Sequence, residues 1–164
     1  MTDSESAQKI EREKNPLDQL FKAKKFDDLT AREIYEIARA RQEIFLMEQN
    51  IICRDLDGVD YDALHCFIEE GERVVAYLRA YRSDGEVKIG RVLTISHGIG
   101  HGRLLMEKSM AVIRDFFGCE KILLHSQCQA EEFYLKLGFC RCSDVFLEEG
   151  IEHVEMEIIC PKAD

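Results

Sequence analysis

Three glycines occupy alternate positions in the segment Ser96-His-Gly-Ile-Gly-His-Gly102, immediately before an apolar-periodic run. The chain has only 10 glycines in 164 residues, and glycine destabilises the interior of helices and strands. A strand that leads through a glycine-rich turn into a helix is typical of a phosphate site. The first turn of a helix has unpaired N–H groups and a positive potential, and glycines let an anion approach the backbone. The segment therefore indicates binding of a phosphorylated compound.

Two common phosphate-binding motifs do not fit this segment. A Walker A motif requires Gly-Lys-Ser/Thr, whereas Gly102 is followed by Arg103 and Leu104. A Rossmann fingerprint requires G-x-G-x-x-G, and the glycines at positions 98, 100 and 102 have a different last interval. A loop without any ligand stays the alternative interpretation of the glycines alone, because isolated glycine motifs are weak signals.

Periodicity and turn signals predict the elements that position this loop. Thr30-Ala-Arg-Glu33 has the pattern of a capping box, which starts a helix, and Asp84-Gly85 is a tight-turn signal between two strands. Short turns make consecutive strands antiparallel, while a helix between strands is a crossover. The predicted elements are a helix over 30–47, strands over 66–69, 74–81 and 87–95, a helix ending at Gly118, a strand over 121–125, a helix over 130–137, and strands over 139–146 and 153–159. This order predicts an α/β fold with a mixed sheet and helices on both faces.

Length and composition predict a single folded domain. Residues 1–25 are polar and charge-mixed and are expected to form an arm, as a loose helix or a disordered segment, while residues 26–164 form the domain. The N-terminus lacks the apolar region of a secretory signal, and no apolar run reaches about 18 residues. We therefore expect a cytoplasmic protein that does not span a membrane.

Charge and cysteine usage exclude several classes of partner. The formal net charge is −10 with a pI near 5.0, which argues against nucleic acid, because phosphate binding needs a basic face. The 7 cysteines include no C-x-x-C pair and are expected to be reduced thiols. The spacing of His, Cys, Asp and Glu in the sequence does not indicate a metal site.

Two segments resemble the GNAT N-acetyltransferases. His97-Gly-Ile-Gly-His-Gly102 resembles the acetyl-CoA pyrophosphate loop of that family, and the segment 130–139 resembles its A-x-x-F-Y-x-x-x-G-F signature. A narrower resemblance, to the ElaA-like branch, is carried by the segments 41–45, 48–49, 55–58 and 147–153. The resemblance implies a GNAT-like, largely antiparallel sheet and transfer of an acetyl group from acetyl-CoA to a primary amine of a small molecule or peptide. His97 stands where the family usually has Arg or Gln, and the connection 94–96 looks about two residues short.

The resemblance also implies a role for particular residues. Tyr134 falls on the position that often protonates the departing thiolate, and a homodimer is common in the family. A base must deprotonate the acceptor, and the candidates are Glu43, Glu48, His65 and His153, which could equally be solvated or structural residues. The cofactor-binding residues implied are Val92, Leu93 and Thr94 for the pantetheine arm and His97, Gly98, Ile99, Gly100, His101, Gly102 and Arg103 for the pyrophosphate. Those implied along the acceptor groove are Arg41, Gln42 and Arg91.

Two other classes of function stay open at this point. The departure at His97 and the short connection suit a CoA-binding regulatory or sensor protein that does not transfer acetyl groups. A dinucleotide-dependent enzyme is the third class, and it predicts stabilisation by NAD rather than by acetyl-CoA.

Overall fold

The computed structural model describes residues 16–160, and these residues form an eight-stranded sheet flanked by helices. Its elements in chain order are η1 (Pro16–Leu20), β1 (Phe21–Lys25), η2 (Phe26–Asp28), α1 (Ala31–Arg41), the π-helical η3 (Gln42–Glu48), η4 (Val59–Asp62), β2 (Leu64–Glu70), β3 (Arg73–Ser83), β4 (Glu86–Thr94), α2 (His101–Phe117), β5 (Lys121–Gln127), η5 (Cys128–Ala130), α3 (Glu131–Lys136), β6 (Cys140–Arg141), β7 (Phe146–Glu148) and β8 (Ile151–Ile159). The strand order is β1-β2-β3-β4-β5-β8-β6, with β7 also paired to β8.

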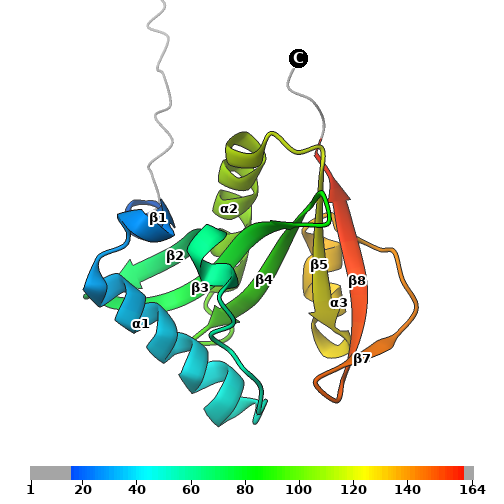
Figure 1. Cartoon of the computed structure of the whole chain (residues 1–164), viewed down its shortest axis with the longest axis horizontal. Helices are drawn as coiled ribbons and strands as arrows, with labels where there is room; N and C mark the ends of the chain where they lie inside the picture. Colours follow the sequence, from blue (N-terminus) through cyan, green and yellow to red (C-terminus); the bar gives the residue numbers. More distant parts are fainter. Residues whose placement is uncertain (1–15, 161–164) are drawn as a thin grey trace, which may run out of the picture.

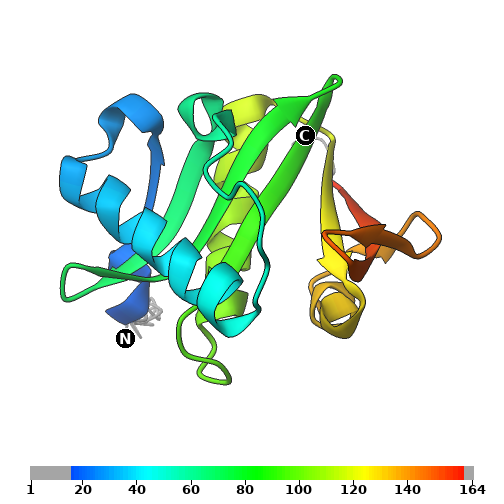
Figure 2. The ribbon, with the colours of Figure 1, turned by 60° about the horizontal axis from the view of Figure 1, so that its bottom comes forward.

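The sheet is mixed and mostly antiparallel, as the sequence predicts. Among the described strands, only β4 and β5 pair in parallel, and α2 is the crossover between them. Helix α1 covers one face, and α2 and α3 pack on the other (Figures 1 and 2). The prediction of helices on both faces of a mixed sheet is therefore confirmed.

Each face of the sheet has its own apolar core. Cys66 and Ile68 of β2 point toward α2, whereas Phe67 between them packs beneath α1. Because both faces are covered, the residues from Leu64 to Ile68 of β2 are all buried instead of alternating between buried and exposed. The two cores together fix the position of β4, whose end carries the glycine loop.

The N-terminal boundary differs from the expected one at residue 26. Strand β1 pairs antiparallel with β2, with Phe21 opposite Ile68, so residues 21–25 belong to the sheet. Phe21 and Ala23 alternate with lysines, which is a strand pattern, but five residues are too few to stand out in a polar segment. The first 15 residues of the expected arm lie outside the described part of the chain.

The strand predicted over 139–146 is wrong as a continuous element. Within that stretch and just beyond it, Cys140–Arg141 and Phe146–Glu148 are separate short strands, and both pair with β8. Between them the backbone N–H of Glu155 donates to Ser143 Oγ at 2.7 Å. A side-chain hydroxyl thus takes the place of a strand carbonyl, and the chain leaves the sheet there.

The predicted capping box at the start of α1 is confirmed. Thr30 Oγ1 accepts from the Glu33 N–H, and the Glu33 carboxylate accepts from the Thr30 N–H. Lys24 also pairs with Glu33 at 2.9 Å. Burial opposes ionisation of Glu33, but the Thr30 amide and Lys24 outweigh it and lower its pKa to about 2.

We expect Glu33→Gln to lower the free energy of unfolding at pH 7 by about 3 kcal/mol, because the pKa of Glu33 falls from 4.5 to about 2 and each pKa unit is equivalent to about 1.4 kcal/mol. The contribution of a carboxylate with a lowered pKa is complete above the unfolded pKa and is lost as pH falls from about 4.5 to about 2. Urea unfolding at several pH values measures it. Curves for the two proteins that stay parallel over this pH range would contradict the assignment.

Candidate active site

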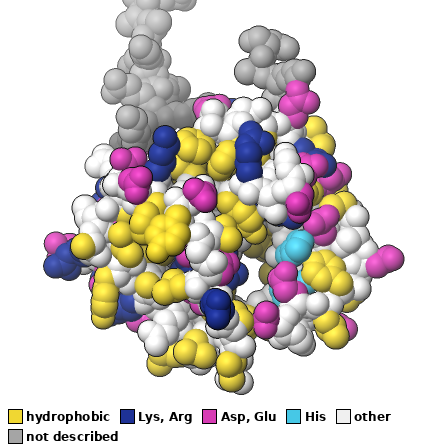
Figure 3. All heavy atoms as spheres, in the orientation of Figure 1, with side chains coloured by type: hydrophobic (Ala, Val, Ile, Leu, Met, Phe, Trp, Pro, Cys, Tyr) yellow, Lys and Arg dark blue, Asp and Glu magenta, His cyan; other side chains and the backbone are white. Residues whose placement is uncertain are grey.

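Strands β4 and β5 diverge beside the glycine loop. They pair only over Val87–Ile89 and Ile122–Leu124. Beyond that point β4 bulges against β3 between Tyr77 and Arg79, and Arg91 in the bulge has a φ of 55°. The edge of β4 that faces β5 therefore has no strand partner after Ile89. Figure 3 shows the surface hollowed between the two halves of the sheet.

The glycine loop joins the free end of β4 to the first turn of α2. Gly98 and Gly100 have φ of 76° and 86°, so the backbone at both positions is left-handed, which favours glycine. At Gly102 the φ is not left-handed, and a Cβ would lie 3.4 Å from both Thr94 Cγ2 and Phe133 Cζ. That distance is ordinary contact, so neither strain nor a clash within the chain requires glycine at position 102.

The amides of this loop have no hydrogen-bond partner in the described part of the chain. Among residues 16–160, no hydrogen bond is made by the backbone N–H groups from Gly98 to Arg103, and the next N–H, of Leu104, donates to the Gly100 carbonyl at 3.1 Å. Gly100 is the N-cap and has no side chain to occupy these donors. The N-terminus of α2 therefore presents free donors to solvent, with the positive potential of a helix of 17 residues.

The side chains of the loop do not all point toward these amides. His97 Nε2 lies 2.8 Å from Glu48 Oε1, so an expected phosphate-binding residue and a candidate base contact each other. Arg103 is exposed and pairs with Glu107. His101 is buried 3.3 Å from Glu70, so only its backbone can serve the loop.

The strand segment expected to hold the pantetheine arm divides its side chains between the two cores. Leu93 packs beneath α1 and Val92 against the α2 side. Thr94 ends the strand and lies 3.4 Å from His97 Nδ1 through its hydroxyl. A ligand can therefore contact the backbone edge of these residues more readily than their side chains.

Tyr134 lies on α3, directly beside the loop. Its neighbour Phe133 touches the space above Gly102, and its own ring packs edge-on against Phe133 and Phe139. The ring is 7% exposed, and its hydroxyl makes no hydrogen bond to any described residue. Burial raises the pKa of Tyr134, so the phenol stays protonated and can donate.

Six charged side chains fix the segment that follows α1 to the sheet. Arg41 pairs with Asp55 at 2.8 Å and Asp60 at 2.6 Å, and Arg79 forms two 2.7 Å hydrogen bonds to Asp57. Hydrogen bonding to Arg79 lowers the pKa of Asp57 to about 2. Arg91 joins the network through Asp55 Oδ1 at 2.7 Å.

This network changes the interpretation of two expected groove residues. Arg41 is 1% exposed and bound by aspartates, so it supports the groove from within. Arg91 is half-buried and also engaged with Asp55, whereas Gln42 is exposed. Arg79 gave no signal in the sequence, because an arginine in a strand pattern looks like a solvent-facing residue.

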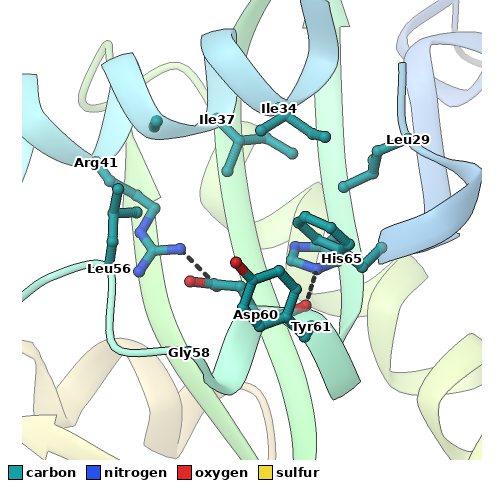
Figure 4. A pocket seen from close by; sticks show the side chains of 11 residues that line it. Leu29, Ile34, Ile37, Arg41, Leu56, Gly58, Asp60, Tyr61 and His65 are labelled. Atoms are coloured by element: carbon teal, nitrogen blue, oxygen red, sulfur yellow. Dashed lines mark hydrogen bonds and ion pairs between the residues drawn. The ribbon is translucent and has the colours of Figure 1, made fainter. Parts of the chain in front are cut away.

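The candidate bases His65 and Glu43 already have hydrogen-bond partners within the protein. His65 is 2% exposed, with Nδ1 2.8 Å from the Tyr77 hydroxyl and Nε2 2.8 Å from the Asp60 carbonyl. Burial lowers the pKa of His65, which favours a neutral structural ring. It lies at the wall of a pocket of about 250 Å³ between α1 and η4, with Arg41 and Asp60 (Figure 4). Glu43 is held by Arg39 at 3.2 Å and Arg73 at 3.3 Å.

On the far side of the cleft, the candidate base His153 lies near three residues for which the sequence predicted no role. His153 is buried with Nδ1 2.7 Å from the Ile151 carbonyl, and near it lie His125, Glu148 and Glu155. The motif 147–153 was the available signal, since it contains Glu148 and His153.

Two general properties complete the description of the site. Within residues 16–160, no group of three or more His, Cys, Asp or Glu side chains is arranged to hold a metal ion. Over the same residues, none of the helices combines the length and apolar character that a membrane-spanning segment requires.

Comparison with known proteins identifies the family of this chain. Residues 40–160 match the family model described as the acetyltransferase (GNAT) domain. The chain therefore belongs to the GNAT acetyltransferase family, and the resemblance expected from the sequence is confirmed. Membership of this family favours acyl-CoA over a dinucleotide as the ligand.

Relatives narrow the position of the chain within this family. A UPF0039 protein of Schizosaccharomyces pombe is 34% identical over 84% of this chain and 95% of that protein. The ElaA protein of Escherichia coli is 29% identical over 79% of this chain and 89% of its own length. Its crystal structure superposes with a TM-score of 0.78, at 28% identity, over 84% of this chain and 97% of that one. A Pseudomonas aeruginosa acyl-CoA N-acyltransferase has the same TM-score of 0.78, at 30% identity, with the same coverage.

We expect Asp60→Asn to lower the free energy of unfolding by about 3 kcal/mol, because Asp60 bridges the buried guanidinium groups of Arg41 and Arg79. Urea unfolding at pH 7 measures the change. Asp62→Asn is the matched control, since Asp62 is exposed and two residues away. Equal stability of the two variants would show that the network is not a structural support.

Proposed function

We propose that this protein is an acetyl-CoA-dependent N-acetyltransferase that acts on a primary amine of a small molecule or peptide. The observation that carries the proposal is the set of backbone amides from Gly98 to Arg103, which have no hydrogen-bond partner among residues 16–160 and lie where diverging β4 meets the N-terminus of α2. Free amides at a helix N-terminus bind phosphate groups, and an unpaired strand edge suits an amide-containing arm. The similarity to the Pseudomonas aeruginosa acyl-CoA N-acyltransferase supports the same class of acyl donor.

The residues of the cleft fit such a donor. The pyrophosphate would accept from the amides of residues 98–103, and the pantetheine arm would extend along the backbone of Val92, Leu93 and Thr94. Gly102 leaves open the space between Thr94 and Phe133 that a Cβ would enter. The thioester would then lie between β4 and β5, where the hydroxyl of Tyr134 can protonate the departing sulfur.

The acceptor side offers fewer residues than the sequence suggested. Gln42 is free to contact an acceptor, while Arg41 and Arg91 would act by holding the wall of the groove. Of the candidate bases, Glu48 stands nearest to the glycine loop through its contact with His97. Glu43, His65 and His153 are bound elsewhere in the protein and are weaker candidates.

One observation favours a second function. His97 binds Glu48 instead of facing the loop amides, so the side chain that usually helps to hold the pyrophosphate is engaged elsewhere. A CoA-binding regulatory protein without acetyl transfer would tolerate such an arrangement. In either case we propose a cytoplasmic protein with reduced thiols, and a homodimer as its assembly.

Acetyl-CoA and CoA should each stabilise the protein, whereas NAD should not. At a hundredfold excess over the dissociation constant the gain is about 2.7 kcal/mol, which a thermal melt detects readily. Stabilisation by NAD alone would refute the proposed ligand. Turnover then separates the two functions, because thiol release with a panel of amines is expected only from a transferase.

Gly102→Ala should weaken acetyl-CoA binding about tenfold without lowering the melting temperature of the free protein. The added methyl group makes only ordinary contacts with Thr94 and Phe133, but it fills the space between them that the donor would use. Titration calorimetry measures the affinity, and a melt of the free variant is its control. Unchanged affinity would show that acetyl-CoA does not use this space.

Tyr134→Phe should reduce kcat about 100-fold while leaving acetyl-CoA affinity nearly unchanged, since it removes a proton donor and keeps the packed ring. Steady-state thiol release gives kcat, and the melting shift with acetyl-CoA reports binding. A variant with the wild-type rate would exclude Tyr134 from the mechanism.

A further inference from the structure

A cluster of titratable side chains holds His125 on the face of β5 opposite α2. His125 Nδ1 lies 2.8 Å from Glu148 Oε1, and Nε2 lies 3.1 Å from Glu155 Oε2. The second oxygen of Glu148 is 3.5 Å from His153 Nε2. The ring of Phe146 packs edge-on against His125 with 5.0 Å between centroids. Three strands, β5, β7 and β8, thus fix the orientation of a single imidazole.

The position of His125 along β5 connects this cluster to the cleft. Leu124 is the last residue of β5 that pairs with β4, so His125 is the first residue past the point where the strands part. Leu124 belongs to the core beneath α2, and strand alternation therefore directs His125 to the other face. Gln127, two residues further along that face, donates to Gln49 Oε1 at 2.9 Å. The cluster therefore borders the cleft on the α1 side, opposite the glycine loop and α2.

The chemistry of the cluster suits an amine that arrives with a proton. The two carboxylates can attract an ammonium group, and the imidazole side chain is 35% exposed, so a proton can pass from it to water. Hydrogen bonding to Glu148 raises the pKa of His125 above its ordinary 6.5, with burial opposing and Glu155 adding to the effect. The other charged groups that face the cluster are His153 from β8 and Arg91 from β4, and both help His125 to lower the pKa of Glu148. A raised pKa makes the imidazole a stronger base, which accepts a proton from an ammonium group more readily.

We propose that His125, Glu148 and Glu155 form the acceptor subsite, which binds the ammonium form of a primary alkylamine and removes its proton. This assignment rests on the proposed acetyl transfer. The ammonium gives one proton to the imidazole, and the neutral nitrogen then forms the C–N bond to the thioester carbonyl carbon as the C–S bond breaks. The nitrogen loses its second proton to the same cluster. Of these two protons, one offsets the proton that Tyr134 gives to the thiolate, and the other leaves to solvent.

The proposal specifies a class of acceptor. An alkylamine has a pKa near that of lysine, about 10.4, and is almost entirely protonated at pH 7. An aromatic amine is neutral at that pH and needs no base before it attacks. Loss of the cluster should therefore affect the two kinds of amine differently.

The experiment compares an alkylamine with an aromatic amine at saturating acetyl-CoA and pH 7.5, with thiol release as the readout. In His125→Gln and Glu148→Gln, kcat/KM for the alkylamine should fall about 100-fold, while the value for the aromatic amine stays within about twofold. The deficit should shrink at pH 10, where the alkylamine is partly neutral without help. Glu152→Gln is the matched control, because Glu152 is an exposed carboxylate on the same strand, β8, and the substitution removes the same charge. It should leave both rates unchanged.

The outcomes distinguish this inference from the proposed function. If the wild type transfers acetyl groups and His125→Gln matches it with the alkylamine, the acceptor subsite is refuted and the transferase assignment stands. An equal loss with both amines would indicate a merely structural cluster and would also refute the subsite. Absence of transfer by the wild type to either amine would overturn the proposed function, and this inference with it. The melting shift with acetyl-CoA verifies that each variant is folded and binds the donor.

Discussion

The separation of β4 from β5 is the constraint on which the rest of the site depends. A parallel pair of strands continues as long as both keep the same twist and their backbone groups find partners. Here the bulge at Arg91 turns β4 away after three residue pairs. That turn exposes a strand edge, directs the chain into the glycine loop, and leaves the face of β5 at His125 open. Continued pairing would have satisfied more hydrogen bonds but would have left no room for a ligand.

The free-energy cost of leaving these strand edges unpaired is offset by polar contacts on both sides of the cleft. On the side of β4, Arg41, Arg79 and Arg91 bind three aspartates, and their pairing avoids uncompensated charge in a partly buried region. On the other side, Glu148 and Glu155 hold His125. The hydrogen bond from Gln127 to Gln49 spans the gap without a net charge. The walls of the cleft are thus held in place before any ligand arrives, which reduces the ordering cost of binding.

Local signals predicted most of the fold, and contacts between distant segments account for most of what they missed. The capping box at Thr30, the turn at Asp84-Gly85 and the stop at Gly118 each act over a few residues, and the structure has all three. Strand β1 and the break at Ser143 depend instead on partners far along the chain, namely β2 and Glu155. The same limit applies to the site. The free amides of the loop follow from glycine spacing, but no spacing rule places Glu48 against His97 or Glu148 against His125, because those partners are 49 and 23 residues apart.

The π-helical turn η3 sets the angular positions of Glu48 and Gln49. Its hydrogen bonds reach one residue further than those of an α-helix, as in the bond from the Gln49 N–H to the Ile44 carbonyl at 2.9 Å. Such a segment contains one residue more than the α-helical path would need. Removing a single residue between Gln42 and Glu48 would therefore let this segment wind as an α-helix and leave Glu48 and Gln49 close to their present orientation. Chain length is thus less tightly specified here than in α1, where each residue accounts for about 100° of the turn and a deletion would rotate everything that follows.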